Sequence, residues 1–176
     1  MAVGLAMERF ADDYAATVRV ASPWLWNGRL AFAMVGGPAW YSDLRALPDS
    51  PEGQDFKVQS IFGRVRMQGE LALPLAAAAG RLYVAAGPSV LWLPERLSTT
   101  RISFGGYGAA GIELFAGDGY RTYPVAFYFE VGVAAHTASQ DVASRTGPVE
   151  ETDLTVDRPI GTGFAVHGGL RFYLWR

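Results

Sequence analysis

Hydrophobic side chains recur at every second position over long stretches of this chain. Residues 125–134 read VAFYFEVGVA, and residues 164–174 read FAVHGGLRFYL. Such alternation is typical of β-strands, whose successive side chains point to opposite faces, and the many aromatic and β-branched residues favour the same interpretation. The pattern predicts eight strands, at residues 2–10, 14–26, 29–41, 57–75, 81–93, 103–116, 120–135 and 160–175.

The connections between these strands mostly alternate between tight turns and longer polar loops. Three tight turns are expected, at Asn27-Gly28 (a dipeptide favoured in two-residue hairpins), at 76–80 and at 117–119. The remaining connections are the short 11–13, the intermediate 94–102, and the long 42–56 and 136–159. In an up-and-down meander, alternate connections lie at opposite ends. Short turns at one end, longer loops at the other and an even strand count are typical of a bacterial outer-membrane barrel.

A membrane-spanning helix is the alternative for a chain that is 50% hydrophobic and only 18% charged. The longest apolar stretch, Leu71–Leu93, contains two prolines, two glycines and Arg81. Each interior proline costs about 3 kcal/mol in a helix, and an arginine at the centre of a membrane helix costs roughly 2.5–3.5 kcal/mol. We therefore expect a single domain, residues 1–176, that is all-β: an eight-stranded antiparallel up-and-down transmembrane β-barrel.

One parity of the expected strands carries nearly all of their charge. Its ionisable residues are Glu8, Arg19, Arg64, Arg66, Glu70, Glu113, Glu130, His167 and Arg171. An arginine facing lipid near the bilayer midplane costs roughly 2–4 kcal/mol, so this parity is expected to face the lumen. A one-residue slip of strand 57–75 would expose both Arg64 and Arg66 to lipid, so the charges also fix the register. Side chains can fill an eight-stranded lumen. The charges therefore predict a structural plug, with a gated narrow pore as the alternative.

Aromatic residues gather near the expected strand ends. The tight-turn end has Trp24, Trp26, Tyr120, Tyr123, Phe172 and Trp175, and the loop end has Tyr14, Trp40, Tyr41 and Trp92. Membrane barrels carry an aromatic girdle at each membrane–water interface. We predict that these side chains form the two girdles.

The meander and its last strand resemble the small eight-stranded outer-membrane barrels of Gram-negative bacteria, of the OmpA, OmpX and OmpW kind. The resemblance is architectural and covers the whole chain. In that group the last strand alternates hydrophobic residues and ends in an aromatic one. Leu170, Phe172 and Leu174 match the alternation, whereas Arg176 follows Trp175 at the final position.

The resemblance implies a bacterial outer-membrane location, with both termini periplasmic and the long loops extracellular. It also implies a monomer that contacts outer-membrane lipid and lipopolysaccharide and that the barrel assembly machinery inserts.

Candidate residues for catalysis are few. The chain has no cysteine, and its two histidines are His136 and His167. Hydrolytic chemistry needs a nucleophile, a base and an orienting group within hydrogen-bonding reach. His136 has Ser139 three residues later, and His167 shares its parity with Glu130 without a nearby serine. We predict no catalytic residue, no metal site and no cofactor, and a net charge of −2 gives no reason to expect nucleic acid.

The expected function is that of a non-enzymatic integral outer-membrane protein, with a structural or envelope-interaction role or narrow passage of small solutes. One alternative is a lipid-modifying outer-membrane enzyme, either an acyltransferase or a deacylase. A second alternative is a soluble lipocalin-like carrier with the apolar parity inward. A carrier's cavity should not collect four arginines and several glutamates on a single parity.

Overall fold

The computed structural model describes residues 1–10, 13–46, 55–74, 80–94, 98, 100–116, 124–137 and 160–174. These residues form eight strands: β1 (Ala2–Phe10), β2 (Asp13–Ala21), β3 (Leu30–Ala46), β4 (Asp55–Pro74), β5 (Gly80–Trp92), β6 (Ile102–Phe115), β7 (Val125–His136) and β8 (Gly163–Tyr173). The part of the chain that is described contains no helix long and apolar enough to cross a membrane.

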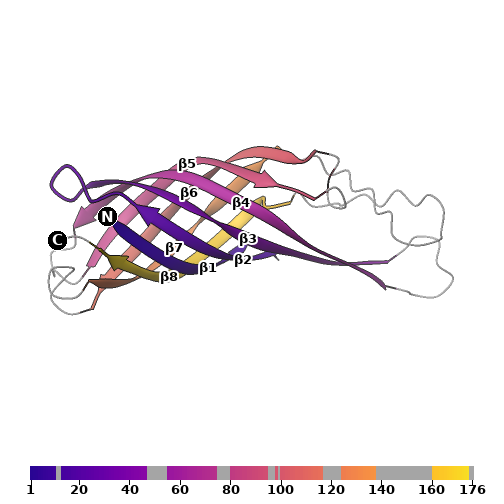
Figure 1. Ribbon diagram of the computed structural model, residues 1–176, viewed down its shortest axis with the longest axis horizontal. Coiled ribbons are helices and arrows are strands. Elements are labelled where there is room, and N and C mark those ends of the chain that lie inside the picture. Colours follow the sequence, from indigo (N-terminus) through magenta and orange to yellow (C-terminus); the bar gives the residue numbers. More distant parts are fainter. Residues whose placement is uncertain are drawn as a thin grey trace.

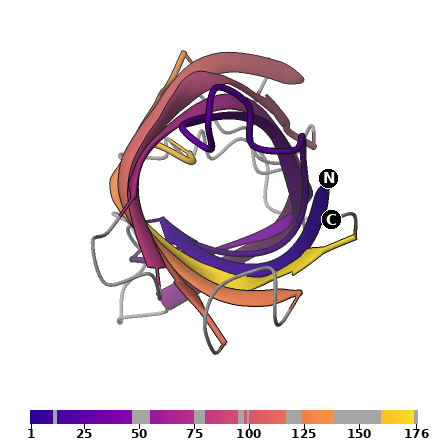
Figure 2. The same ribbon diagram turned by 90° about the vertical axis from the view of Figure 1, so that its left-hand side faces the viewer.

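The strands close into one antiparallel barrel in which each strand pairs with its neighbours in the chain (Figures 1 and 2). β1 closes the ring against β8, with Ala2 opposite Tyr173 and Phe10 opposite Ala165. The N-terminus and the end of β8 lie at the same end as the turn between β2 and β3 (Figure 1). The predicted eight-stranded, antiparallel, up-and-down barrel is confirmed.

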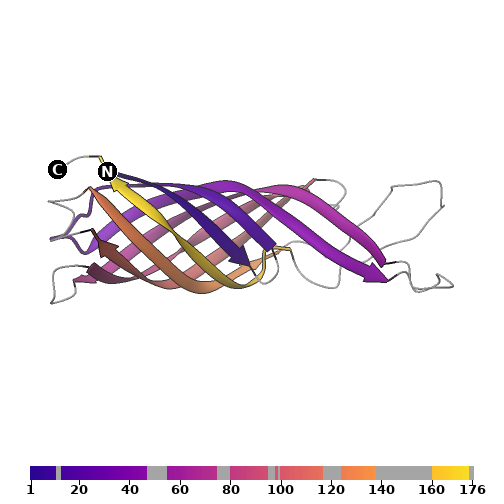
Figure 3. The same ribbon diagram turned by 90° about the horizontal axis from the view of Figure 1, so that it is seen from below.

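β3 and β4 are the longest strands and extend past the rest of the barrel at the end opposite the termini (Figure 3). Their pairing continues to Ala46 opposite Asp55. β2, by contrast, begins at Asp13 and β5 ends at Trp92, opposite Gly63. The far part of β3 and β4 is therefore a two-stranded ribbon.

The turn between β2 and β3 differs from the prediction. A two-residue hairpin was expected at Asn27-Gly28, but the turn spans four residues, 26–29, and is closed by a bridge between Leu25 and Leu30. Trp26, Asn27 and Gly28 all have positive φ. β2 also ends at Ala21 rather than at residue 26. Pro23 provides the reason, since it has no N–H to donate to the ladder.

Side chains alternate between the outside and the inside of the barrel along every strand. Large apolar residues cover the outside, among them Leu5 (59% exposed), Met67 (61%) and Leu73 (66%). Small, aromatic and charged residues fill the inside. Gly111 makes room there, because a Cβ at this position would lie 2.6 Å from Cζ of Tyr83. The inside is therefore packed rather than open, as expected for eight strands.

The loop end of the lumen contains a buried group of apolar side chains. One buried cluster there, which we call the mouth cluster, includes Phe10, Tyr41, Phe62, Leu91, Leu93, Tyr107 and Ile160. Ionised side chains fill the barrel below it.

Candidate functional site

Six of the eight strands supply the nine predicted ionisable residues, which lie together inside the barrel. β1 contributes Glu8, β2 Arg19, β4 Arg64, Arg66 and Glu70, β6 Glu113, β7 Glu130, and β8 His167 and Arg171; all are at most 2% exposed. The structure thus places the whole predicted set on the inner face. The period of two explains this, since the positions on each strand share one parity.

Glu130 has five hydrogen-bonding partners among the described residues. Its Oε1 accepts hydrogen bonds from Arg19 (2.6 Å) and from the hydroxyl of Tyr83 (2.9 Å). Its Oε2 lies 3.3 Å from Nη2 of Arg66, 3.1 Å from the Tyr107 hydroxyl and 2.9 Å from Nδ1 of His167. A buried carboxylate is stable only with such compensation.

Two further carboxylates connect the turn-side half of the barrel. Glu70 pairs with Arg19 and, at 3.4 Å, with Arg171. Glu113 lies 3.3 Å from Arg171 and 3.0 Å from Arg81. Arg81 was not among the predicted residues, although it stands on the inward parity of β5 two residues before Tyr83. The prediction considered only the central part of each strand, and Arg81 stands at the start of β5.

Glu8 is shared by two guanidinium groups on the loop side. Arg66 Nη1 donates to one oxygen of Glu8, and Nη1 of Arg64 lies 3.3 Å from the other. Arg64 also lies over the ring of Phe10, with its Cζ 3.6 Å from the ring centroid. None of the Arg64 nitrogens has a hydrogen-bond partner among the residues described. Arg64 is therefore the least satisfied cation of this interior.

Aromatic rings separate the guanidinium groups from one another. Tyr128 lies between Arg19 and Arg171, whose Cζ atoms are 5.0 and 5.2 Å from its ring centroid. The Cζ of Arg66 is 3.9 Å from the ring centroid of Tyr107. Cations over aromatic faces gain electrostatic stabilisation that is larger when water is excluded. The rings therefore allow several buried arginines to coexist.

His167 has a polar partner on every side. Its Nδ1 lies 2.9 Å from both Glu130 and Arg66, while Nε2 lies 3.0 Å from Oγ1 of Thr17 and 3.3 Å from the hydroxyl of Tyr128. Thr17 was not predicted as part of the site. Thr17 has the inward parity of β2, but it is uncharged, and the prediction selected only ionisable residues.

The structure places only some of the predicted girdle residues on the outer face of the barrel. Tyr14, Trp26, Trp40, Trp92 and Phe172 lie on the outside, each at least 37% exposed. Three further residues, Tyr120, Tyr123 and Trp175, lie outside the described residues.

Two aromatic predictions are wrong. Tyr41 is buried in the mouth cluster, because it shares the inward parity of β3 with Ala39. Trp24 packs against Ala72 and Tyr83 at the turn end, and the guanidinium of Arg81 lies 4.4 Å from its ring centroid. The early end of β2 allows the chain around Trp24 to cover this end of the lumen.

His136, at the loop end, has hydrogen-bonding partners that are not members of the charge network. Its Nε2 is 2.7 Å from Oγ of Ser89 on β5. Ser139, its expected neighbour in sequence, lies outside the described residues. Because Ser89 is 47 positions away in the chain, this pairing gave no local signal in the sequence.

No protein-family model, curated protein or solved structure matches this chain. Among the residues that the structure describes, no group of three or more His, Cys, Asp or Glu is placed to hold a metal ion. The geometry of the barrel therefore carries the functional argument by itself.

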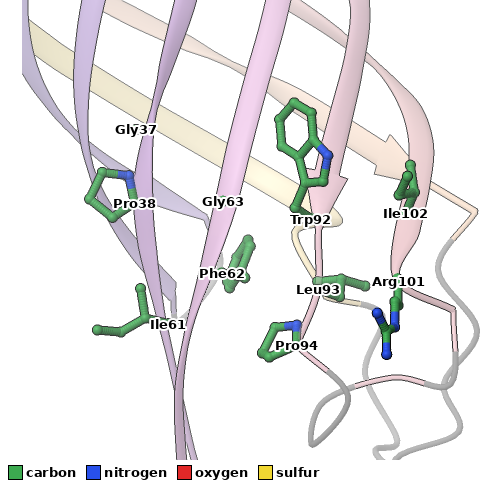
Figure 4. Close-up of a pocket in the computed structure, with 10 residues that line it drawn as sticks. All are labelled: Gly37, Pro38, Ile61, Phe62, Gly63, Trp92, Leu93, Pro94, Arg101 and Ile102. Carbon is green, nitrogen blue, oxygen red and sulfur yellow. The ribbon is translucent and has the colours of Figure 1, made fainter.

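The outer wall is hollowed near the loop end (Figure 4). This open groove of about 560 Å³ runs from β3 across β4 and β5 to the start of β6, with Pro38 and Ile61 on one side and Trp92, Arg101 and Ile102 on the other. Most of these side chains are apolar. The outside of the barrel thus offers an apolar surface even where it is not smooth.

Proposed function

We propose that this chain is an integral outer-membrane protein of a Gram-negative bacterium, whose barrel is closed by its own charge network. The observation that carries the proposal is the inverted distribution of polarity. Apolar side chains cover most of the outside around the ring, while four glutamates and five arginines of the strands are buried inside: Glu8, Glu70, Glu113, Glu130, Arg19, Arg64, Arg66, Arg81 and Arg171. A soluble monomer rarely exposes apolar patches beyond a few hundred Å², whereas a membrane barrel requires a continuous apolar band.

The ion pairs support a structural role over passage of solutes. Arg19 and Glu130 join β2 to β7, Arg66 and Glu8 join β4 to β1, and Arg171 and Glu70 join β8 to β4. These strands are not neighbours in the ring, so each pair crosses the lumen. These three ion pairs have a structural, non-catalytic role.

The ends of the barrel suggest its orientation. The N-terminus and the end of β8 lie at the end with the turn between β2 and β3, which we assign to the periplasm, and the β3–β4 ribbon projects on the extracellular side. In this position the protein is a monomer that contacts lipopolysaccharide and other outer-membrane lipid, after insertion by the barrel assembly machinery. The projecting end is the part available for envelope interactions.

Accessibility in intact cells tests the proposal, because a chain without cysteine gives no background for thiol labelling. Thr137→Cys lies at the loop end and Asn27→Cys in the turn between β2 and β3. A membrane-impermeant maleimide should label Thr137→Cys in intact cells, and Asn27→Cys only after the outer membrane is permeabilised. A protein that stays soluble without detergent would contradict the proposal.

A further inference from the structure

His136 is held at the loop end by three hydrogen-bonding partners. Its backbone N–H donates to Oγ1 of Thr162 (3.0 Å), its Nδ1 lies 3.0 Å from the carbonyl oxygen of Gly161, and its Nε2 lies 2.7 Å from Oγ of Ser89. The ring is therefore fixed in position and in orientation.

A glycine lets the imidazole reach Ser89 across an intervening strand. Ser89 on β5 is opposite Gly105 on β6, and Gly105 is opposite His136 on β7. A Cβ on Gly105 would lie 2.5 Å from Cδ2 of His136, a separation that no real side chain allows. The ring thus lies over the space that Gly105 leaves empty.

The protonation state of His136 follows from its partners. The Gly161 carbonyl can only accept, so Nδ1 must carry the proton. In the neutral imidazole, Nε2 is then the acceptor and Ser89 the donor. This is the arrangement of a serine nucleophile, a histidine base and an orienting acceptor.

His167 and Thr17 do not form an equivalent pair. The Nδ1 of His167 faces both the Glu130 carboxylate and a guanidinium N–H of Arg66, and its Nε2 faces Tyr128 as well as Thr17. That ring has no single assignment of donor and acceptor. His136 does, and it is also partly exposed at the loop end.

The surroundings of Ser89 combine a cation with apolar side chains. Arg64 lies on the neighbouring strand, since Ser89 is opposite Arg66, and Arg64 is the next inward residue towards the loops. Its charge acts on the His136 ring, and its nitrogens lack hydrogen-bond partners among the described residues. Leu91, on the same inner face as Ser89, belongs to the mouth cluster. A carbonyl oxygen suits the guanidinium, and an apolar chain suits the cluster.

We propose that Ser89 and His136 are the nucleophile and the general base of an esterase site that cleaves carboxylic esters with an apolar acyl group. Oγ of Ser89 attacks the carbonyl carbon while His136 Nε2 takes its proton, and Arg64 stabilises the oxyanion. The C–O bond to the alcohol then breaks, and the imidazolium returns the proton to the leaving oxygen. Water attacks the acyl-serine with His136 again as base, and the free acid leaves as Ser89 recovers its proton.

Covalent labelling tests this site directly. The refolded full chain in detergent micelles is treated with a fluorophosphonate probe, and the modified peptide is mapped by mass spectrometry. The expected result is modification at Ser89. It should disappear in Ser89→Ala, and its rate should fall about 100-fold or more in His136→Ala, the range of general-base contributions. Hydrolysis of p-nitrophenyl butyrate should likewise be lost in Ser89→Ala and be about 100-fold or more slower in His136→Ala.

Ser103 provides the matched control. It is buried on the inner face of β6, and its Oγ has no hydrogen-bond partner among the described residues. Ser103→Ala should label like the parent chain. Heat-modifiable gel migration checks that each variant folds. Folded parent protein that stays unlabelled, labelling at another serine, or an unchanged rate in folded His136→Ala would each overturn the proposal, and labelling of the parent decides it even if a variant fails to fold.

Discussion

Nη1 of Arg19 lies 2.6 Å from Oε1 of Glu130 and connects β2 to β7 across the lumen of the barrel. Neither strand is next to the other in the ring, so this contact is independent of the backbone ladder. The same carboxylate lies within hydrogen-bonding distance of four further groups. The interior is thus organised around Glu130 rather than as separate pairs.

The first prediction concerns this carboxylate. Glu130→Gln keeps the shape of the side chain but leaves Arg19 and Arg66 short of a counter-charge. Removing one partner of a buried ion pair costs about 3–5 kcal/mol, and we expect a loss of that size in the free energy of unfolding. Urea titration of the protein in lipid vesicles measures it. Arg29→Gln, which removes an exposed charge in the turn after β2, should change the value by less than about 0.5 kcal/mol. Equal effects of the two substitutions would contradict the central position of Glu130.

The second prediction concerns the space inside the barrel. A Cβ at Gly111 would lie 2.6 Å from Cζ of Tyr83, whereas one at Gly69 would meet nothing within 4 Å. Gly111→Ala should push Tyr83 away from Glu130 and cost about 1–3 kcal/mol through overpacking. Gly69→Ala should change stability by less than about 0.5 kcal/mol. Urea unfolding of both variants in the same vesicles makes the comparison, and a harmless Gly111→Ala would mean that Tyr83 is free to move.

The charged interior could be predicted because strand parity is a local signal. Each of the nine ionisable residues was assigned from its own strand, and the same parity on every strand brought them together. The cost of an arginine in lipid then decided which face was inner. Arg81 was not predicted because it stands at a strand boundary, where parity arguments are weakest.

Other features depend on contacts between strands, which the pattern of a single strand does not predict. Ser89 and His136 meet only because β5, β6 and β7 are in a particular register and Gly105 lies between them. Trp24 and Tyr41 were assigned to the interfaces from their nearness to strand ends. Nearness to an end does not say which way a side chain points, and an early strand end at Ala21 changed the position of Trp24.

The third prediction separates a membrane barrel from a soluble one. Val131 lies on the outside near the middle of β7, and Ile102 on the outside at the first residue of β6. In a bilayer, Val131→Arg should cost about 2–4 kcal/mol and Ile102→Arg only about 0–1 kcal/mol, since the penalty falls towards the interfaces. Unfolding in vesicles measures both. Similar small effects at the two positions would mean that the outer face does not contact hydrocarbon.

The last prediction concerns passage through the lumen. Arg66 contacts Glu8, Gln68, Glu130 and His167 and lies over Tyr107, so its side chain occupies the middle of the barrel. The parent protein should therefore give no stable conductance in planar bilayers. The double variant Glu8→Ala with Arg66→Ala removes both members of one ion pair and keeps the net charge, and it should give resolvable single-channel events. Arg29→Gln, outside the lumen, should remain silent. A parent protein that conducts as well as the double variant would show that the ion pairs do not close the lumen.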